Sequence, residues 1–236
     1  MYSQHTTLCP FLLPHPIWIA AGAFVNVCAD DLGEREIPMS EFFVDYRRTA
    51  LKPTEIIRSV FVPHLQEHEY VEAYKQSRRR EDDLAIVNAG MRVRLAPDTQ
   101  GELVVQDVCI AYGGVHKKVI RAEKTEAALQ GKAWNQTLLD LALNTIPSDI
   151  PLATDAPGGM VEFRRTLTTT LFFKFYLTVL SRLDPASLEK REASAIERIH
   201  RPVSCATHLY ETPLVGKGGL DTIGQPVPHL AAEKQV

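Results

Sequence analysis

The sequence predicts an α+β fold in which an antiparallel sheet from Glu55 to Gly113 is followed by packed helices. Ile, Val, Phe and Tyr, which favour strands, are frequent before Gly113. The segment Glu69–Gln76 shows the two-residue alternation of a half-buried strand. After Val119 the apolar residues follow a helical spacing instead. This change of period near Ile120 is the reason to expect helices packed on the sheet.

Four segments are predicted to be strands of this sheet. Pro63 closes the first, because proline cannot donate a hydrogen bond to a neighbouring strand. A turn at Pro97–Gly101 joins the third and fourth as an antiparallel pair. A further stretch, Pro16–Val27, is predicted to be a strand or a buried segment. The four strands are Glu55–Pro63, Glu69–Gln76, Leu84–Leu95 and Leu103–Gly113.

Three segments are predicted to be helices: Ala122–Leu129, Asn135–Thr145 and Met160–Leu183. The last is the longest, about 36 Å at 1.5 Å per residue. Apolar residues surround much of it, which indicates a central core helix rather than a functional one. Arg164 and Arg165 near its start oppose the helix dipole, so we expect them to pair with nearby carboxylates.

Composition excludes several classes of function. The chain has 236 residues, 45% hydrophobic and 23% charged, which suits one globular domain and a tail. The net charge is −3 and no basic face dominates, so a nucleic-acid partner is not expected. The four cysteines are far apart, which disfavours a metal site or disulfides and favours a reducing compartment. They are Cys9, Cys28, Cys109 and Cys205.

Neither a secretory signal nor a membrane span is expected. The apolar stretch Leu8–Cys28 is interrupted by prolines, and no Lys or Arg precedes Arg35. No uninterrupted apolar run reaches the roughly 20 residues that span a bilayer.

A run of charges stands between two of the predicted strands. Arg78, Arg79 and Arg80 are followed at once by Glu81, Asp82 and Asp83. The plain interpretation is a solvated turn with local ion pairs, each contributing about 0–1 kcal/mol.

The sequence around this charge run nevertheless resembles one protein family. The stretch Tyr74–Leu95, YKQSRRREDDLAIVNAGMRVRL, is similar to the flavin domain of xanthine dehydrogenases, which are molybdenum hydroxylases. Aldehyde oxidases share the domain but usually lack the paired Asp82–Asp83. The resemblance covers roughly residues 16–183, with a weaker echo at 224–236. The other segments that resemble the family are AYGGV at 111–115, DAPGGMVEFRRTL at 155–167 and FFKFYLTVL at 172–180.

The resemblance implies three parts along the chain. Residues 1–50 would be a remnant of the flavin-binding lobe with a divergent N-terminus. Residues 51–185 would form a domain like the C-terminal domain of the CO dehydrogenase flavoprotein. Residues 186–236, rich in Pro and Gly near their middle, would be an irregular linker towards a molybdenum-cofactor domain. We therefore expect a fragment without the iron–sulfur domains, the front FAD lobe or the molybdenum domain.

The resemblance also implies the cofactor and its contacts. FAD would be bound here, while molybdopterin and 2Fe-2S clusters would belong to the other domains. Ile57 and Lys75 would contact the flavin, and Arg47 would lie near it. Asp82 would lie in the loop that tunes NAD against oxygen as electron acceptor. No catalytic residue and no metal ligand is expected in this chain.

Each of these residues also has a plain structural interpretation. Ile56 and Ile57 are adjacent, so in a strand one can enter the core while the other faces a ligand. Lys75 ends a mostly apolar face, where it either meets an acceptor or extends into solvent. Arg47 could be a simple surface charge.

The resemblance implies an oxidoreductase that hydroxylates purines and passes electrons through FAD to NAD or oxygen. Such enzymes are homodimers, and a cytoplasmic location is expected, with the peroxisome as a possibility. We expect this chain alone to be inactive. Two alternatives stay open: a non-enzymatic module that binds a partner, and a flavin domain of aldehyde-oxidase type.

Overall fold

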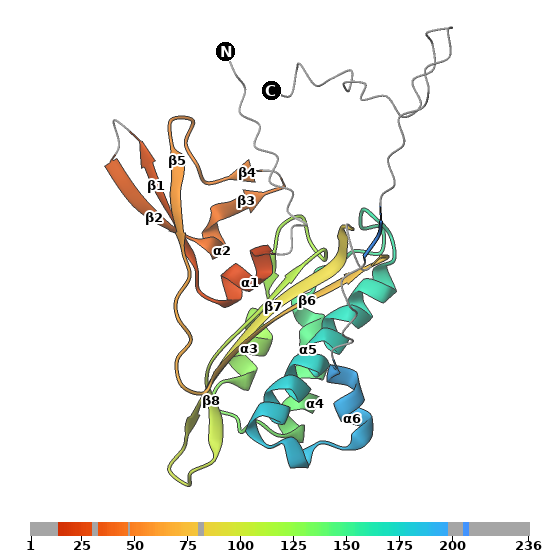
Figure 1. The fold of residues 1–236 in the computed structure, drawn as a ribbon. Coiled ribbons are helices and arrows are strands. Elements are labelled where there is room, and N and C mark those ends of the chain that lie inside the picture. The colour runs from red at the N-terminus through yellow and green to blue at the C-terminus, as the bar shows by residue number, and fades with distance from the viewer. Residues whose placement is uncertain (1–13, 30–32, 47, 80–82, 198–204, 208–236) are drawn as a thin grey trace, which may run out of the picture. The chain divides into compact units, whose positions relative to one another are not determined.

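The computed structural model describes residues 14–29, 33–46, 48–79, 83–197 and 205–207. The chain divides into two units, residues 1–197 and 198–236. Of the second unit only three exposed residues, 205–207, are described. Arg47 and Asp82, both predicted to lie near a flavin, fall outside the described residues. The helices and strands all belong to the described part of the first unit (Figure 1).

The first sheet is three-stranded and antiparallel, in the order β2-β1-β5. Its strands are β1 (Phe24–Ala29), β2 (Gly33–Pro38) and β5 (Ile56–Phe61). We expected the strand after Glu55 to open the larger sheet, and this was wrong, because β5 pairs with β1 through Val25–Val60 and Val27–Ile57. The predicted boundary between residues 50 and 51 therefore cuts through this sheet.

Two short helices and a small ribbon complete this lobe. The stretch predicted as strand or buried segment divides into helix α1 (Pro14–Ala20) and strand β1, with a turn at Gly22, whose φ is 70°. The remaining elements are α2 (Met39–Phe42), β3 (Phe43–Asp45) and β4 (Arg48–Thr49). The buried core of the lobe consists of Ala23, Val25, Val27, Ile37, Met39, Phe42 and Phe43. We call this part, from α1 to β5, the N-terminal lobe.

The second sheet confirms the other three predicted strands. It runs in the order β6-β7-β8-β9, with every pair antiparallel. Its strands are β6 (Glu69–Ser77), β7 (Ala85–Pro97), β8 (Leu103–Gly113) and β9 (Ile120–Arg121). Side chains alternate between its faces, so one face of β7 is a continuous apolar row. That row is Val87, Ala89, Met91, Val93 and Leu95, all buried.

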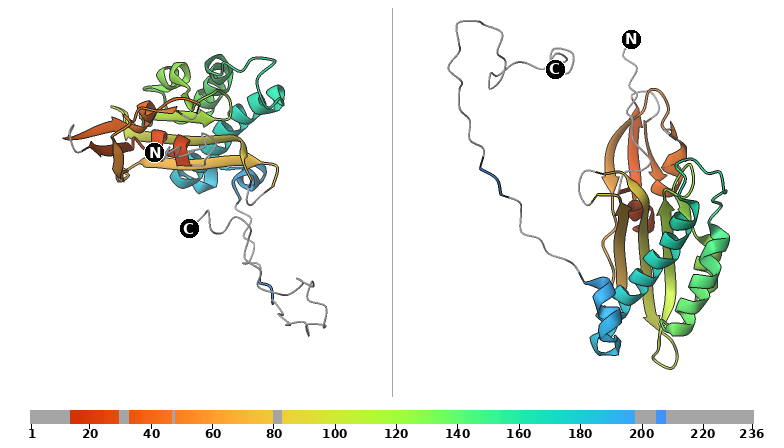
Figure 2. Two further views of the ribbon diagram at one scale, coloured as in Figure 1. Left: turned by 90° about the horizontal axis from the view of Figure 1, so that it is seen from above. Right: turned by 90° about the vertical axis from the view of Figure 1, so that its right-hand side faces the viewer.

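Helices cover the face that carries this row (Figure 2). They are α3 (Glu123–Leu129), α4 (Gln136–Asp149) and α5 (Val161–Leu183). Asn135 caps α4, because its side chain accepts a hydrogen bond from the backbone N–H of Leu138 at 3.2 Å. The long helix agrees with its prediction, and its buried Phe172, Phe175 and Tyr176 lie at the centre of the core.

Part of the predicted linker is ordered structure. A short 3₁₀ turn, η1 (Pro185–Ser187), and helix α6 (Lys190–Ile196) follow α5. Leu188 and Ile196 pack against the main core. Within the part of the chain that the structure describes, no helix is long and apolar enough to cross a membrane.

Candidate flavin-binding wall

Lys75 lies near the end of β6, on a row that crosses the second sheet. The row consists of Lys75, Asn88 and Gly113, from β6, β7 and β8. Residues that are directly opposite in antiparallel strands project to the same face. Lys75 is half-buried, and it lies on the face opposite the apolar row of β7. The next row, Ala73–Gly90–Ala111, contains only small residues. Gly90 and Ala111 are buried and helix α1 lies on this part of the sheet, so Lys75 stands at the edge of a strip of small residues that the helix covers.

Asn88 is a buried polar residue of the same row that the sequence analysis did not single out. It is only 1% exposed, beside Lys75. A Cβ added at Gly113 would lie 2.2 Å from Asn88 Oδ1, so the amide lies directly over the backbone of β8. Burial of an amide is costly unless its polar atoms find partners. An asparagine within an otherwise apolar strand was therefore the feature of the sequence that could have drawn attention to this position.

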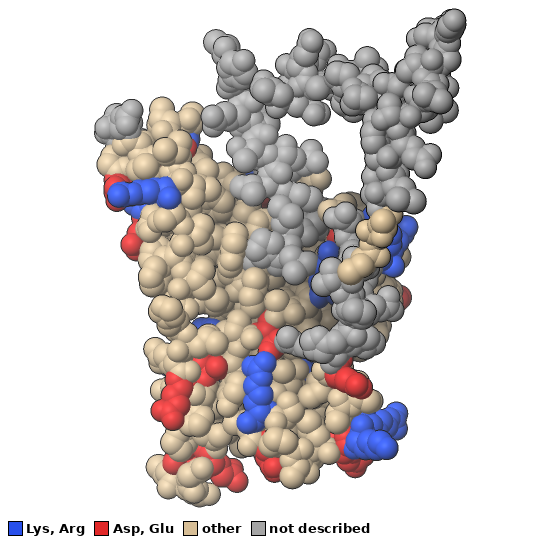
Figure 3. All heavy atoms as spheres, viewed as in Figure 1, with Lys and Arg blue, Asp and Glu red and all other residues tan. Residues whose placement is uncertain are grey.

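Ile57 is exposed on β5 of the N-terminal lobe. The sequence allowed one of Ile56 and Ile57 to enter the core, but neither does, because they are 63% and 41% exposed. The first sheet ends at β5, so within the described residues no further strand covers it. Other large apolar side chains are exposed on β5 and in the segment after it, and Figure 3 shows few charges over this lobe. They are Val60, Phe61, Val62 and Leu65. An apolar surface of this kind indicates a binding face.

An ion-pair cluster fixes the chain just before Ile57. The two oxygens of Glu55 accept hydrogen bonds from Arg35 at 2.8 and 2.9 Å, and Oε2 accepts another from the backbone N–H of Lys52 at 2.7 Å. Arg35 also donates to the backbone oxygen of Ala50 at 3.0 Å. The Arg35 hydrogen bonds, followed by that from Lys52, lower the pKa of Glu55 to about 2. The entry to β5 is thus held by a bidentate, charge-assisted contact.

The charge run is described only at its edges. Asp83 accepts hydrogen bonds from the backbone N–H groups of Arg79 and Leu84, both at 2.9 Å. The bond from Arg79 is the main cause that lowers the pKa of Asp83. Asp83 therefore shapes its own loop, as aspartates in turns do. The residues from Arg80 to Asp82 lie outside the described part.

Arg164 joins two loops at the end of the second sheet where β8 finishes. It donates to the backbone oxygens of Gly114 at 3.0 Å, Pro157 at 3.1 Å and Ala156 at 3.4 Å. The expected carboxylate partner was therefore wrong for Arg164, which is 8% exposed. Burial lowers its pKa. For Arg165 the expectation is confirmed, because it donates to Glu162 at 2.7 Å.

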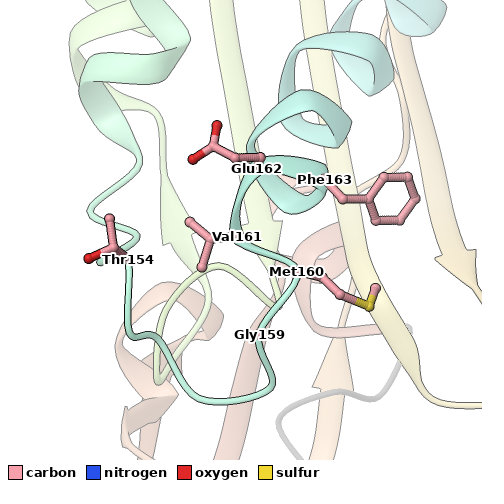
Figure 4. A pocket seen from close by; sticks show the side chains of 6 residues that line it. All are labelled: Thr154, Gly159, Met160, Val161, Glu162 and Phe163. Atoms are coloured by element: carbon pink, nitrogen blue, oxygen red, sulfur yellow. The ribbon is translucent and has the colours of Figure 1, made fainter.

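A shallow hollow of about 440 Å³ lies where α5 begins. Thr154 and residues 159–163 line it. In Figure 4 the side chains of Met160 and Phe163 point to one side, away from Thr154 and Glu162. Met160 has a φ of 52°, an unusual left-handed conformation for a residue with a side chain. The hollow is an accessory surface at the start of α5, and none of its lining residues belongs to the Lys75 row.

The two predicted contacts that are described stand on different sheets. Ile57 belongs to the N-terminal lobe and Lys75 to the second sheet. Helix α1 connects the two, because Trp18 and Ile19 pack on the core of the lobe while the helix lies on β7 and β8. A salt bridge of 3.2 Å between Asp45 and Lys117 also joins them.

The chemistry of these two side chains suits part of a flavin. Lys75 can donate to a ring carbonyl or a phosphate, and Ile57 offers an apolar wall. The sequence contains neither GxGxxG nor GxxxxGK[ST], so it has no glycine loop of the usual kind for a diphosphate. The fit is to part of the cofactor.

Two family models match the chain, one on each side of the link between the sheets. Residues 14–65 match the FAD binding domain in molybdopterin dehydrogenase. Residues 72–179 match the CO dehydrogenase flavoprotein C-terminal domain. Solved structures share this fold. Carbon monoxide dehydrogenase from Hydrogenophaga pseudoflava has a TM-score of 0.60 at 23% identity, over 69% of this chain and 54% of that chain. Quinoline 2-oxidoreductase from Pseudomonas putida 86 has a TM-score of 0.55 at 20% identity, over 80% and 56%.

Curated relatives are more similar in sequence. Xanthine dehydrogenase of Oryza sativa subsp. japonica is 43% identical over 98% of this chain and 17% of its own length. Xanthine dehydrogenase of Dictyostelium discoideum is 40% identical over 98% and 18%. The chain thus spans less than a fifth of the length of these relatives. It belongs to the xanthine dehydrogenase-like molybdenum hydroxylases and represents part of their FAD-binding domain.

Proposed function

We propose that this chain forms one wall of the flavin site in a xanthine dehydrogenase-like oxidoreductase acting on purines. The observation that supports it best is Lys75 itself, a half-buried cation on the outer strand β6, at the end of a row whose other members, Asn88 and Gly113, are buried. Bound FAD would supply the electron relay from the purine-oxidising centre of the whole protein to NAD or oxygen.

Lys75 would bind and orient the flavin. Its ammonium can donate up to three hydrogen bonds, and its charge favours electron-rich oxygens. Because Asn88 and Gly113 are buried, a flat ring system would meet Lys75 at the outer strand β6 and not over the centre of the sheet. Ile57 would cover another part of the ring and exclude water from it.

Arg47 and Asp82 have separate proposed roles. Arg47 would add positive charge near the flavin. The carboxylate of Asp82 would disfavour negative charge on the ring and favour the cationic nicotinamide of NAD, so that it biases acceptor choice. The structure supports a division of labour within the run, because Asp83 is already engaged by the backbone of Arg79 and Leu84.

The replacement Lys75→Met tests this function. In the full-length enzyme we expect the affinity for FAD to fall by about tenfold or more, since a hydrogen bond to a charged group contributes about 1.5–3 kcal/mol. The exposed Lys132, replaced in the same way, is the matched control. Affinity is measured by the recovery of flavin fluorescence on dissociation. Equal affinities for both variants would contradict the role of Lys75.

A non-enzymatic partner-binding function is the second candidate, and the exposed apolar face of β5 favours it. Flavin absorbance in the purified full-length protein separates the two. The aldehyde-oxidase alternative predicts oxygen, not NAD, as the acceptor. We further propose a homodimer in the cytoplasm, in keeping with cysteines that are far apart in the sequence.

A further inference from the structure

We infer that Gly90 and Arg92 are positioning residues that seat α1 on the second sheet and so set how the N-terminal lobe, with Ile57, stands against Lys75. The consequence for flavin rests on the proposed function. The seating itself rests on contacts within the described residues.

Gly90 permits a backbone-to-backbone contact between β7 and α1. A Cβ built at Gly90 would lie 2.2 Å from both the carbonyl carbon and oxygen of Pro16, and 2.3 Å from the backbone nitrogen of Ile17. These atoms belong to a helix backbone and cannot turn aside as a flexible side chain would. The helix would have to move by about 0.8 Å only to restore a separation of 3.0 Å. Glycine here is therefore a requirement of helix placement.

Arg92, one row further along β7, holds the other end of α1. Its Nε donates to the backbone oxygen of Ala20, the last residue of the helix, at 2.7 Å. Its two Nη atoms donate to Glu69 at 2.7 Å and Asp107 at 2.6 Å, on the strands on either side. The guanidinium is thus held in one orientation by β6 and β8 while it binds the helix terminus. A cation at this position also complements the negative end of the helix dipole.

The opposite side of α1 belongs to the N-terminal lobe. The ring of His15 lies 4.0 Å from that of Phe43, and Trp18 packs against the lobe core. The backbone N–H of Ala23 donates to the oxygen of Trp18 at 2.9 Å. A displacement of α1 therefore moves the N-terminal lobe as well. The distance between the apolar side chains of β5 and the Lys75 row changes as a result.

Chemical cross-linking measures this spacing without a cofactor. Asp45 and Lys117 form the salt bridge between the lobe and the β8–β9 loop. We would replace both by Cys, after Cys9→Ser, Cys28→Ser and Cys205→Ser. Cys109 can remain, because it is buried and its pKa is raised to about 12. The full 236-residue chain is then treated with a short bifunctional thiol reagent.

The variants compared are Gly90→Ala, Arg92→Lys and the control Val93→Ala. Lysine keeps the positive charge but lacks the planar fork that reaches three acceptors at once. Val93 is buried on the opposite face of the same strand, so its truncation destabilises the fold without touching α1. We expect cross-linking to slow several-fold for both α1-face variants and to remain fast for the control.

The accessibility of Trp18 gives an independent measurement. The chain has two tryptophans, so Trp134→Phe leaves Trp18 as the only one. Acrylamide should quench Trp18 several-fold more strongly in Gly90→Ala than in Val93→Ala. Equal quenching and equal cross-linking for these two variants would overturn the inference.

Binding of lumiflavin, the ring system alone, to the flavin-free full-length enzyme tests the link to the flavin site. We expect its affinity to fall by about tenfold in Gly90→Ala and to stay unchanged in Val93→Ala, because binding sites tolerate little displacement of their walls. An altered cross-linking rate with unaltered lumiflavin affinity would refute positioning of the flavin site. Absence of lumiflavin binding to the flavin-free, full-length wild-type enzyme would count against the proposed function, and the cross-linking rates would still decide the seating.

Discussion

Replacement of Arg164 by Met should destabilise the fold more than the same change at the next residue. Arg164 donates to three backbone oxygens, those of Gly114, Ala156 and Pro157, at 3.0 to 3.4 Å. It is 8% exposed, so water cannot readily replace it. At roughly 1 kcal/mol net for each hydrogen bond, the variant loses about 3 kcal/mol. For a domain of this size that lowers Tm by about 6–12 °C.

Arg165 is the matched control on the same turn of α5. It pairs with the exposed Glu162 and donates to the backbone oxygen of Leu152 at 2.6 Å. By the same count the hydrogen bond to Leu152 contributes about 1 kcal/mol and the solvent-exposed pair no more than about 1 kcal/mol, so Arg165→Met should cost about 1–2 kcal/mol. Urea unfolding followed by far-UV circular dichroism gives both free energies. Hydrogen exchange should also rise in the loop at 153–159 in Arg164→Met alone.

Equal free energies of unfolding for these two variants would refute the reasoning. That result would mean that the free energy lost by dehydrating the buried guanidinium equals the free energy gained from its three hydrogen bonds.

Two further predictions concern carboxylates. The pKa of Glu55 is lowered from 4.5 to about 2, mainly by Arg35, so this stabilisation is present above about pH 4.5 and is lost as the pH falls toward 2. Glu55→Gln should therefore make the free energy of unfolding fall less steeply between about pH 5 and 2, measured as the urea midpoint of unfolding. A pH dependence equal to that of the wild type would contradict this prediction. In the full-length enzyme Asp82→Ala should weaken NAD use and raise oxygen use, by about 1–4 kcal/mol if the charge lies roughly 4 Å from the ring. Stopped-flow reoxidation of the reduced flavin by each acceptor measures these rates. Asp83→Ala, the control, should change the rates less. Rates equal to those of the wild type for Asp82→Ala would mean that the charge run is only a solvated turn.

Local pattern was sufficient for the strand that carries Lys75 and for the long helix. The alternation of Glu69–Gln76 correctly placed Lys75 with Ala73 and away from Tyr74, whose hydroxyl lies 3.4 Å from that of Thr178 on α5. The apolar surface of Met160–Leu183 likewise predicted a buried helix, observed as Val161–Leu183. These features depend on neighbours a few residues apart, which the sequence displays directly.

The partner of β5, the exposure of Ile57 and the contact at Gly90 were decided only by the tertiary structure. An apolar segment such as Ile56–Phe61 suits many sheets equally well, and its register with Phe24–Ala29 joins residues about 30 positions apart. The proximity of Gly90 to Pro16 spans a still longer separation. Such contacts depend on shape and backbone approach in three dimensions, and no local spacing of residue types encodes them. For that reason the sequence predicted which residues could hold a flavin, whereas the seating of α1 sets how the two walls stand relative to each other.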